Sequence, residues 1–179
     1  PGGLTCGYYL GYEGFEVDLF EAMPEAGGWL RYGIPEYRLP KAILDQEIDL
    51  MCQSGMRIHT RQRLGHQITL SALCRDYDAV CLAVGASKAV PMDYPGSTLA
   101  GCYLGVDYLK DRMLAKRLTT GKRVAVIGGG NTAIDCARTA VRLGAETTLI
   151  YRRTRAEMPA EAYEIDEAEQ EGVRFLMLT

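Results

Sequence analysis

Three consecutive glycines stand between a strand-like run and a helix-like run, and their spacing suits the binding of a phosphate group. Residues 122–127 read KRVAVI, and Gly128, Gly129, Gly130 and Ala133 then form a G-x-G-x-x-A pattern. The first glycine permits a tight turn, the third leaves room for a pyrophosphate at a helix N-terminus, and the alanine lets the helix pack against the strand. A bare glycine triplet also serves ordinary turns, but the flanking strand and helix favour dinucleotide binding.

Two adjacent arginines follow the next strand-like run. Arg152 and Arg153 stand near the position where an NAD-binding unit carries an acid for the ribose 2′-hydroxyl. Two guanidinium groups there can hold a 2′-phosphate through charge-assisted, forked hydrogen bonds, whereas an acid would repel it. The pattern therefore predicts NADPH, and the alternative is a solvated basic strand end. Arg155 either assists or faces water.

The start of the chain has a layout similar to that of the region after Gly128, but it begins at a later position of the glycine motif. We interpret Gly3 as the last glycine of a G-x-G-x-x-G turn whose earlier part is expected before Pro1. The interval from Gly3 to Glu21 matches that from Ala133 to Arg152 within one residue. A carboxylate at this strand end suits an unphosphorylated ribose, as in FAD, and the alternative is an ordinary surface acid.

The elements that must position these residues alternate along the chain. We expect helices at residues 4–14, 41–54, 69–77, 106–116, 129–144 and 160–171. Strands are expected at residues 15–21, 56–62, 78–84, 122–128, 146–152 and 173–179, with a loop at 22–40. Such alternation is typical of parallel βαβ units.

The predicted fold is therefore α/β, with two tandem Rossmann-like dinucleotide-binding units, both incomplete. The expected FAD-binding domain covers residues 1–95 and lacks its first strand and closing segment. The expected NADPH-binding domain covers residues 96–179 and is truncated at its C-terminus. The Pro- and Gly-rich residues 91–101 mark the boundary.

Composition excludes several other classes. The chain of 179 residues is 47% hydrophobic with a net charge of −3, which argues against a nucleic-acid partner. No apolar run is long enough for a membrane helix, and no secretory signal is visible. The six cysteines form no CxxC pair, and we expect buried free thiols, no metal site and a cytoplasmic location.

Beyond these patterns, four stretches resemble one family. PGGLTCGYYL, EAMPEAGGWLRYGIPEYRLP, GKRVAVIGGGNTAIDCARTAVRLGAE and YRRTRAEMPA resemble the NADPH-dependent glutamate synthase small (beta) subunit family, which includes the flavin module of dihydropyrimidine dehydrogenase. The resemblance covers nearly the whole chain. It implies a flavoprotein with two nested dinucleotide-binding domains, which passes a hydride from NADPH to FAD and electrons onward through iron–sulfur clusters.

The resemblance also implies roles for individual residues. On the FAD side these are Pro1, Gly2 and Gly3 at the pyrophosphate, Glu21 at the adenosine ribose, Gly27, Gly28, Trp29 and Leu30 along the cofactor, Arg38 in contact with it, Leu64 near the adenine and Gly85 near the flavin. On the NADPH side these are Gly129, Gly130, Asn131 and Thr132 at the phosphates, with Arg152 and Arg153 on the 2′-phosphate. Relatives usually carry a small residue or Met in place of Trp29.

The leading hypothesis is an NADPH-oxidising, FAD-containing electron-entry module that serves a larger catalytic subunit or domain. The iron–sulfur clusters are expected in a partner or domain outside this chain. One alternative is a related flavoprotein linked to ferredoxin or a pyrimidine, and another is an NADPH-binding sensor or scaffold without turnover. We name no catalytic acid or base, because in such enzymes the flavin performs the difficult step and the protein contributes orientation and exclusion of water. His59 and His66 have no Ser or Cys partner at motif spacing, and we expect them to be surface or strand residues.

Overall fold

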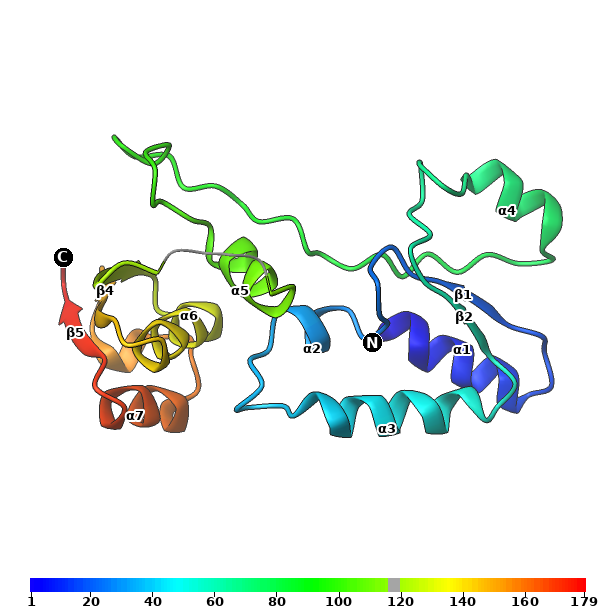
Figure 1. Ribbon diagram of the computed structural model, residues 1–179, viewed down its shortest axis with the longest axis horizontal. Helices are drawn as coiled ribbons and strands as arrows, with labels where there is room; N and C mark the ends of the chain where they lie inside the picture. The colour runs from blue at the N-terminus through cyan, green and yellow to red at the C-terminus, as the bar shows by residue number, and fades with distance from the viewer. Residues whose placement is uncertain (116–119) are drawn as a thin grey trace. The chain divides into compact units, whose positions relative to one another are not determined.

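The computed structural model describes residues 1–115 and 120–179, and these form two compact units (Figure 1). The first unit is Pro1–Ser87 and the second is Lys88–Thr179. The boundary between them therefore lies before the Pro- and Gly-rich stretch, whereas the sequence suggested a boundary after residue 95.

The first unit is built on two short parallel strands. β1 (Asp18–Phe20) pairs with β2 (Arg57–His59), with Asp18 opposite Arg57. Helices α1 (Gly2–Tyr12) and α3 (Lys41–Cys52) pack together beside this pair (Figure 1). Their shared core consists of Leu4, Ala26, Leu44, Ile48 and Met56.

The two longer helices of this unit were predicted correctly, whereas the expected loop at 22–40 contains a short helix, α2 (Trp29–Tyr32). Helix α3 begins after Pro40 and buries Leu44 and Ile48, which lie one turn apart on the same face. Helix α4 (Leu70–Asp76) is capped by the hydroxyl of Thr69, which accepts the N–H of Ala72 at 3.2 Å.

The prediction of a buried strand at residues 78–84 is wrong. These residues have no regular secondary structure, and the side chains of Leu82 and Val84 are 58% and 74% exposed. A strand needs a neighbour that supplies donors and acceptors, and among the described residues β1 and β2 pair only with each other. The run lies along α1 instead, where a Cβ built on Gly3 would be 3.4 Å from that of Ala83.

The expectation of buried thiols is also wrong for most cysteines. All six are free, as expected, but Cys74, Cys81 and Cys102 are exposed and only Cys136 is buried. Cys81 is exposed because its run does not join the sheet. The Cys136 thiol donates to the carbonyl of Gly105 at 3.5 Å, and burial, followed by the nearby Asp135 charge, raises the pKa of this thiol to about 12.

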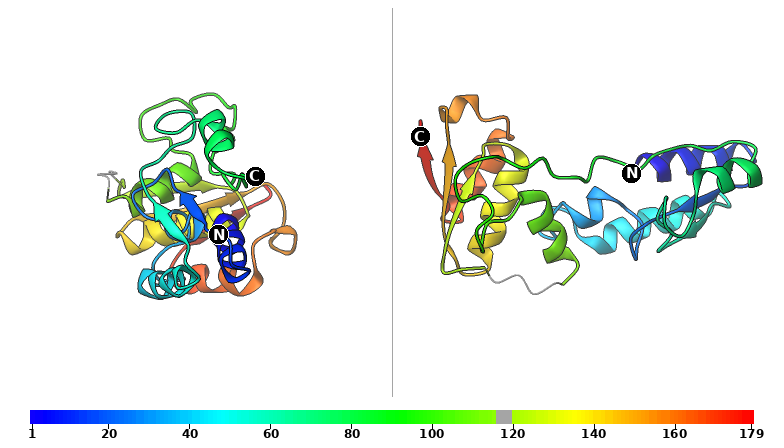
Figure 2. Two further views of the ribbon diagram at one scale, coloured as in Figure 1. Left: turned by 90° about the vertical axis from the view of Figure 1, so that its right-hand side faces the viewer. Right: turned by 90° about the horizontal axis from the view of Figure 1, so that it is seen from above.

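The second unit is a strand-helix-strand-helix-strand arrangement. β3 (Arg123–Ile127), β4 (Glu146–Tyr151) and β5 (Arg174–Met177) form a parallel sheet in the order β3-β4-β5. Helices α6 (Asn131–Arg142) and α7 (Ala162–Gln170) cover one face of it (right view of Figure 2). The core between these layers consists of Ile134, Ala137, Leu149, Met158, Ala160, Ile165, Ala168 and Val173.

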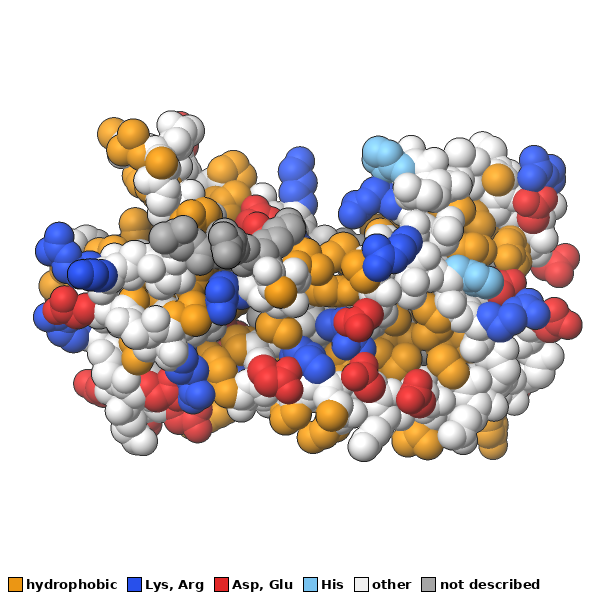
Figure 3. Space-filling model, viewed as in Figure 1, with side chains coloured by type: hydrophobic (Ala, Val, Ile, Leu, Met, Phe, Trp, Pro, Cys, Tyr) orange, Lys and Arg blue, Asp and Glu red, His pale blue; other side chains and the backbone are white. Residues whose placement is uncertain are grey.

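Two further elements complete this unit. Helix α5 (Gly105–Met113) packs against α6, and Lys116, the expected end of this helix, lies outside the described residues. A single 3-10 turn, η1 (Arg155–Glu157), follows β4. Basic and acidic side chains are interspersed on the face shown in Figure 3, and none of the described helices is both long and apolar enough to cross a membrane.

Candidate functional site

The first glycine of the predicted phosphate-binding turn has the conformation that the motif requires. Gly128 has a φ of +141°, in the region that favours glycine, and its N–H donates to the carbonyl of Ile150 at 3.0 Å. A Cβ built on Gly128 would lie 3.2 Å from the Cβ of Ala133. The turn is therefore tight, and a larger residue at either position would separate α6 from the sheet.

The third glycine stands at the start of α6, with little packed against it. Gly130 is the N-cap, and a Cβ built there would meet only Pro159, at 3.9 Å. The first N–H groups of a helix have no acceptor within the helix and lie at the positive end of its dipole. The space beside Gly130 and the free end of the helix together fit a phosphate group.

The middle glycine has a different role. A Cβ built on Gly129 would lie 2.6–2.9 Å from three ring atoms of Tyr151, so only glycine fits beneath this ring. The Tyr151 hydroxyl donates to the carbonyl of Glu157 at 2.9 Å, and the N–H of Ala160 donates to the carbonyl of Gly129 at 3.1 Å. The segment after β4 is thereby attached to the glycine turn.

The two polar residues that begin α6 are engaged with neighbouring elements. Asn131 Oδ1 accepts the N–H of Glu161, the N-cap of α7, at 3.1 Å. The methyl group of Thr132 lies 3.3 Å from a Cβ built on Gly105, at the start of α5. Any phosphate contact of these residues would use their backbone N–H groups, the Asn131 amide nitrogen or the Thr132 hydroxyl.

Both predicted 2′-phosphate residues lie at the carboxyl end of β4. Arg152 and Arg153 are exposed, and the Arg153 carbonyl accepts the N–H of Leu178 at 3.3 Å. Within the described residues, neither guanidinium forms an ion pair with a carboxylate. The placement is consistent with an anion site at this strand end.

Arg155 does not join the other two arginines. Its guanidinium pairs with Asp166 at 2.6 Å and with Glu169 at 3.1 Å, both on α7, and lies 5.6 Å from the centre of the Phe175 ring. Arg155 is therefore engaged by carboxylates of α7 and does not simply face water. It ties η1 to α7 and β5.

The turn after Arg153 is closed by a capping box. The Thr154 hydroxyl and the Thr154 N–H donate to Glu157 Oε2 at 2.8 and 3.1 Å, and the Glu157 N–H donates to the Thr154 carbonyl. The backbone N–H of Thr154, then its hydroxyl, hold the pKa of the Glu157 carboxyl below its usual range. The acid nearest the arginines is thus engaged with the backbone.

In the first unit, Glu21 lies at the end of β1 as predicted. Its Oε1 accepts the N–H of Met23 at 2.8 Å, and no hydrogen bond joins its Oε2 to another described residue. A Cβ built on Gly28, which has a φ of +56°, would lie 3.1 Å from the ring of Pro1, and one built on Gly2 would meet nothing within 4 Å. The start of α1 therefore has open space beside it.

The remaining predicted FAD residues lie in several parts of this unit. Leu30 and Arg38 are half-buried in and after α2, Leu64 is half-buried in a bridge to Ile68, and Gly85 is exposed with a φ of +71°. Gly27 packs between Arg31 and Leu44. The Trp29 ring lies over Gly33, where a Cβ would be 2.0 Å from the ring. The large Trp29 side chain is therefore accommodated because residue 33 is a glycine.

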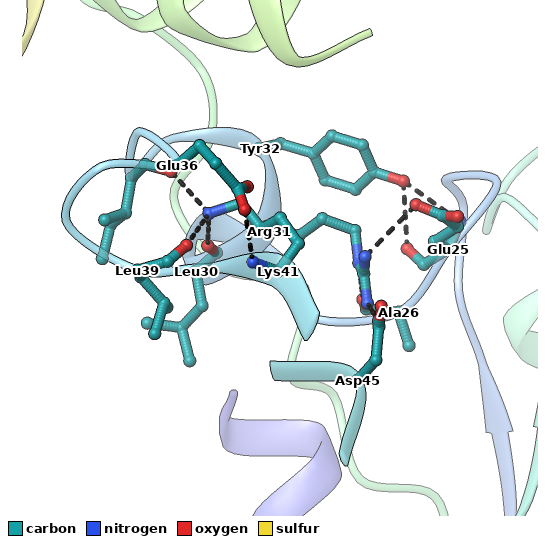
Figure 4. Close-up of polar contacts among 10 residues, drawn as sticks. Glu25, Ala26, Leu30, Arg31, Tyr32, Glu36, Leu39, Lys41 and Asp45 are labelled. Carbon is teal, nitrogen blue, oxygen red and sulfur yellow. Dashed lines mark hydrogen bonds and ion pairs between the residues drawn. The ribbon is translucent and has the colours of Figure 1, made fainter. Parts of the chain in front are cut away.

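Sequence reasoning missed the polar network that shapes residues 25–45 (Figure 4). Arg31 is buried, and its guanidinium donates to the carbonyl of Ala26 and pairs with Glu25 at 3.3 Å and with Asp45. The Tyr32 hydroxyl donates to the carbonyl of Glu25 at 3.1 Å and accepts the N–H of the same residue. These bonds fix the approach to α2.

Lys41 closes the other side of the same segment. Its ammonium donates to three backbone carbonyls, those of Leu30, Ile34 and Leu39, at 3.1, 2.7 and 2.9 Å (Figure 4). Burial lowers the pKa of Lys41, although the nearby Glu36 opposes this. Neither Arg31 nor Lys41 carries a local sequence signal, because the Lys41 ammonium binds backbone carbonyls and the partners of Arg31 include Asp45, 14 residues away.

Comparison with known proteins gives a consistent result. The family model for pyridine nucleotide-disulphide oxidoreductase matches residues 1–179. The chain is 45% identical to the NADPH-Fe(3+) oxidoreductase subunit beta of Geobacter sulfurreducens, over 98% of this chain and 27% of that protein. It is 47% identical to the NADP(+)-dependent formate dehydrogenase subunit beta of Moorella thermoacetica, over 99% of this chain and 26% of that one.

A third relative is the glutamate synthase [NADPH] small chain of Azospirillum brasilense, at 35% identity over 98% of this chain and 39% of that protein. The resemblance to the glutamate synthase small subunit is therefore confirmed. The chain spans about a quarter of the length of the first two relatives. The solved structure of FprA from Mycobacterium tuberculosis in complex with NADPH has a TM-score of 0.75 at 21% identity, covering 93% of this chain and 44% of that one, a likeness of fold. The chain belongs to the pyridine nucleotide-disulphide oxidoreductase family.

Proposed function

We propose that this chain is the nucleotide-binding part of an NADPH-dependent flavoprotein oxidoreductase, in which the second unit holds NADPH and the first holds FAD. The observation that carries the proposal is the pair of exposed arginines at the end of β4, in the same unit as the open helix start at Gly130. The first unit has the carboxylate of Glu21 at the corresponding strand end.

The residues of the first unit fit FAD. The open space at Gly2 and the start of α1 suit a pyrophosphate, and Glu21 Oε2 can accept a hydrogen bond from a ribose hydroxyl. The network of Arg31 and Lys41 holds the segment that carries Gly28, Trp29 and Arg38. When bound, FAD would supply the hydride acceptor, and the chain would supply binding and orientation.

The residues of the second unit fit NADPH. The N–H groups at the start of α6 would bind the pyrophosphate, Gly130 would leave room for it, and Arg152 and Arg153 would bind the 2′-phosphate. An acid would be needed there for a ribose that lacks the phosphate, and none stands at either position.

A double substitution tests the cofactor assignment. We expect Arg152→Ala with Arg153→Ala to weaken NADP⁺ binding by roughly 10²- to 10⁴-fold, because each hydrogen bond to a charged group contributes about 1.5–3 kcal/mol. NAD⁺ binding should change little, as measured by titration calorimetry of the full chain. Arg155→Ala is the matched control, since Arg155 is bound to α7. Equal losses for both nucleotides would refute the 2′-phosphate site.

We further propose that the electrons leave through iron–sulfur clusters to a larger subunit or domain. The relatives named above are a beta subunit of an Fe(3+) oxidoreductase, a beta subunit of a formate dehydrogenase and a small chain of glutamate synthase, which supports a multi-subunit context. The four stretches quoted above favour glutamate synthase as the leading system, whereas the Fe(3+) oxidoreductase and formate dehydrogenase subunits are more similar overall, at 45% and 47% identity against 35%. Ferredoxin- and pyrimidine-linked systems are alternatives within the same class.

Absorbance distinguishes this proposal from an NADPH-binding sensor or scaffold. We expect the purified full-length protein to be yellow and its flavin band to bleach under anaerobic conditions with NADPH, and much less with NADH. A colourless protein that still binds NADPH would favour the sensor.

A further inference from the structure

We propose that Tyr151 and the Thr154–Glu157 capping box are positioning residues that set the preference for NADPH over NADH. They fix the backbone that carries Arg152 and Arg153 relative to the glycine turn. The inference rests on the proposed function, because it takes the two arginines as the 2′-phosphate site. It assigns the preference to neighbouring residues that need not contact the cofactor.

Tyr151 joins the arginines to the glycine turn from one side. It directly precedes Arg152, and its ring lies so close to Gly129 that a Cβ there would be 2.6 Å from Cε2. Its hydroxyl donates to the carbonyl of Glu157 at 2.9 Å, beyond the arginines. The ring and the hydroxyl therefore hold both ends of a short segment against one turn.

The capping box closes that segment from the other side. Glu157 Oε2 accepts both the hydroxyl and the N–H of Thr154, which directly follows Arg153. Two backbone bonds add to this arrangement, from Ala160 N–H to the Gly129 carbonyl and from Leu178 N–H to the Arg153 carbonyl. The backbone of both arginines is thus held between the end of β5 and the glycine turn.

This arrangement matters because the arginine side chains themselves are exposed and long. An exposed arginine loses rotamer freedom when it binds an anion. A backbone that is already held in place lowers the conformational entropy lost on binding. Only NADP carries the 2′-phosphate, so movement of this segment should affect NADP⁺ far more than NAD⁺. A merely structural role would weaken both nucleotides together.

The test measures dissociation constants of NADP⁺ and NAD⁺ for variants of the full chain by titration calorimetry. Tyr151→Phe keeps the ring over Gly129 and removes the hydroxyl, while Thr154→Val keeps the branched shape and removes the capping oxygen. We expect each to weaken NADP⁺ by roughly 3- to 10-fold, the value of one hydrogen bond, with NAD⁺ changed less than about twofold. Thr154→Ser restores the hydroxyl and should bind like the parent chain.

Tyr103→Phe is the matched control, because Tyr103 is an exposed tyrosine outside residues 151–161. Equal weakening of both nucleotides by Tyr151→Phe and Thr154→Val, or no change in either, would overturn this inference. The double variant Arg152→Ala with Arg153→Ala separates failure of the positioning role from failure of the 2′-phosphate site. If that variant loses the preference and the Tyr151 and Thr154 variants keep it, the positioning role fails alone; if it keeps the preference, the 2′-phosphate site itself fails.

Discussion

The two units follow a similar order of helix start, strand and charged strand end, yet they hold their arginines differently. In the first unit, Arg31 is buried with a side chain 9% exposed, and it binds two carboxylates and a backbone carbonyl. The second unit also has a buried arginine, Arg138, which pairs with Glu167 at 2.7 Å and with Glu171 at 2.6 Å. Its Arg155, by contrast, binds two carboxylates with a side chain that is 40% exposed. Arg152 and Arg153 form no ion pair with described residues. The ion-paired arginines therefore stabilise structure in both units, and the exposed pair at the end of β4 is proposed above as a ligand site.

The largest difference should appear in stability. Arg31→Met should lower the free energy of unfolding by about 2–4 kcal/mol, because it removes two charged contacts and leaves the Ala26 carbonyl without its donor. Urea unfolding followed by the fluorescence of Trp29, the only tryptophan, reports on this unit.

Arg155→Met is the comparison at a more exposed arginine of the second unit. It should lower the free energy of unfolding by less than about 1 kcal/mol, since the ion pairs of Arg155 are solvated. Hydrogen exchange of the α7 backbone amides measures this change in stability. If the two substitutions proved equally costly, burial would not distinguish these two arginines.

Glycine substitutions should give the next largest effect. Gly129→Ala should destabilise the protein by about 1–3 kcal/mol, because the added methyl would overlap the Tyr151 ring, as measured by thermal unfolding. The double variant with Tyr151→Ala tests the cause, since removing the ring should make the Gly129→Ala step much cheaper.

Gly2→Ala is the matched change in the first unit. A Cβ there meets nothing within 4 Å, so stability should change by less than about 0.5 kcal/mol. FAD affinity should nevertheless fall, because the methyl would occupy the space proposed for the pyrophosphate. A large loss of stability, or unchanged FAD affinity, would contradict the assignment of this open space.

The last effect concerns the cross-strand pairs of the first unit, and it depends on pH. Hydrogen bonds from Arg57, then His59, hold the pKa of Asp18 well below its ordinary value. The folded pKa lies below the unfolded one, so this stabilisation is complete above about pH 4 and is lost as the pH falls toward the folded pKa.

Asp18→Asn should therefore flatten the decline in stability with acid, as followed by urea unfolding at a series of pH values. The control is Glu146→Gln, which removes the exposed pair with Arg174 in the second unit and should alter that dependence less. An unchanged slope in Asp18→Asn would show that this carboxylate is not the titrating group.

Local patterns were enough to predict most helices and the second sheet. The helix expected at residues 41–54 is α3, and the strands expected at residues 122–128, 146–152 and 173–179 are β3, β4 and β5. The pattern failed at residues 78–84 because apolar content does not supply a pairing partner. The pattern did not identify Tyr151 either, because the Tyr151 ring packs on Gly129, which is distant in sequence. The Thr154-x-x-Glu157 pattern was a visible signal that went unused.

The sequence by itself determined most of the order of the elements, the glycine turn and the opposite charges at Glu21 and Arg152, because these depend on residue type and spacing along one chain. Only the tertiary structure decided which glycine leaves room for a ligand and which for a side chain. It also showed that Arg155 pairs with carboxylates of α7, whereas no ion pair joins Arg152 or Arg153 to a carboxylate of the described residues. Such distinctions depend on contacts between residues that are distant in sequence, and these contacts form only when the chain folds.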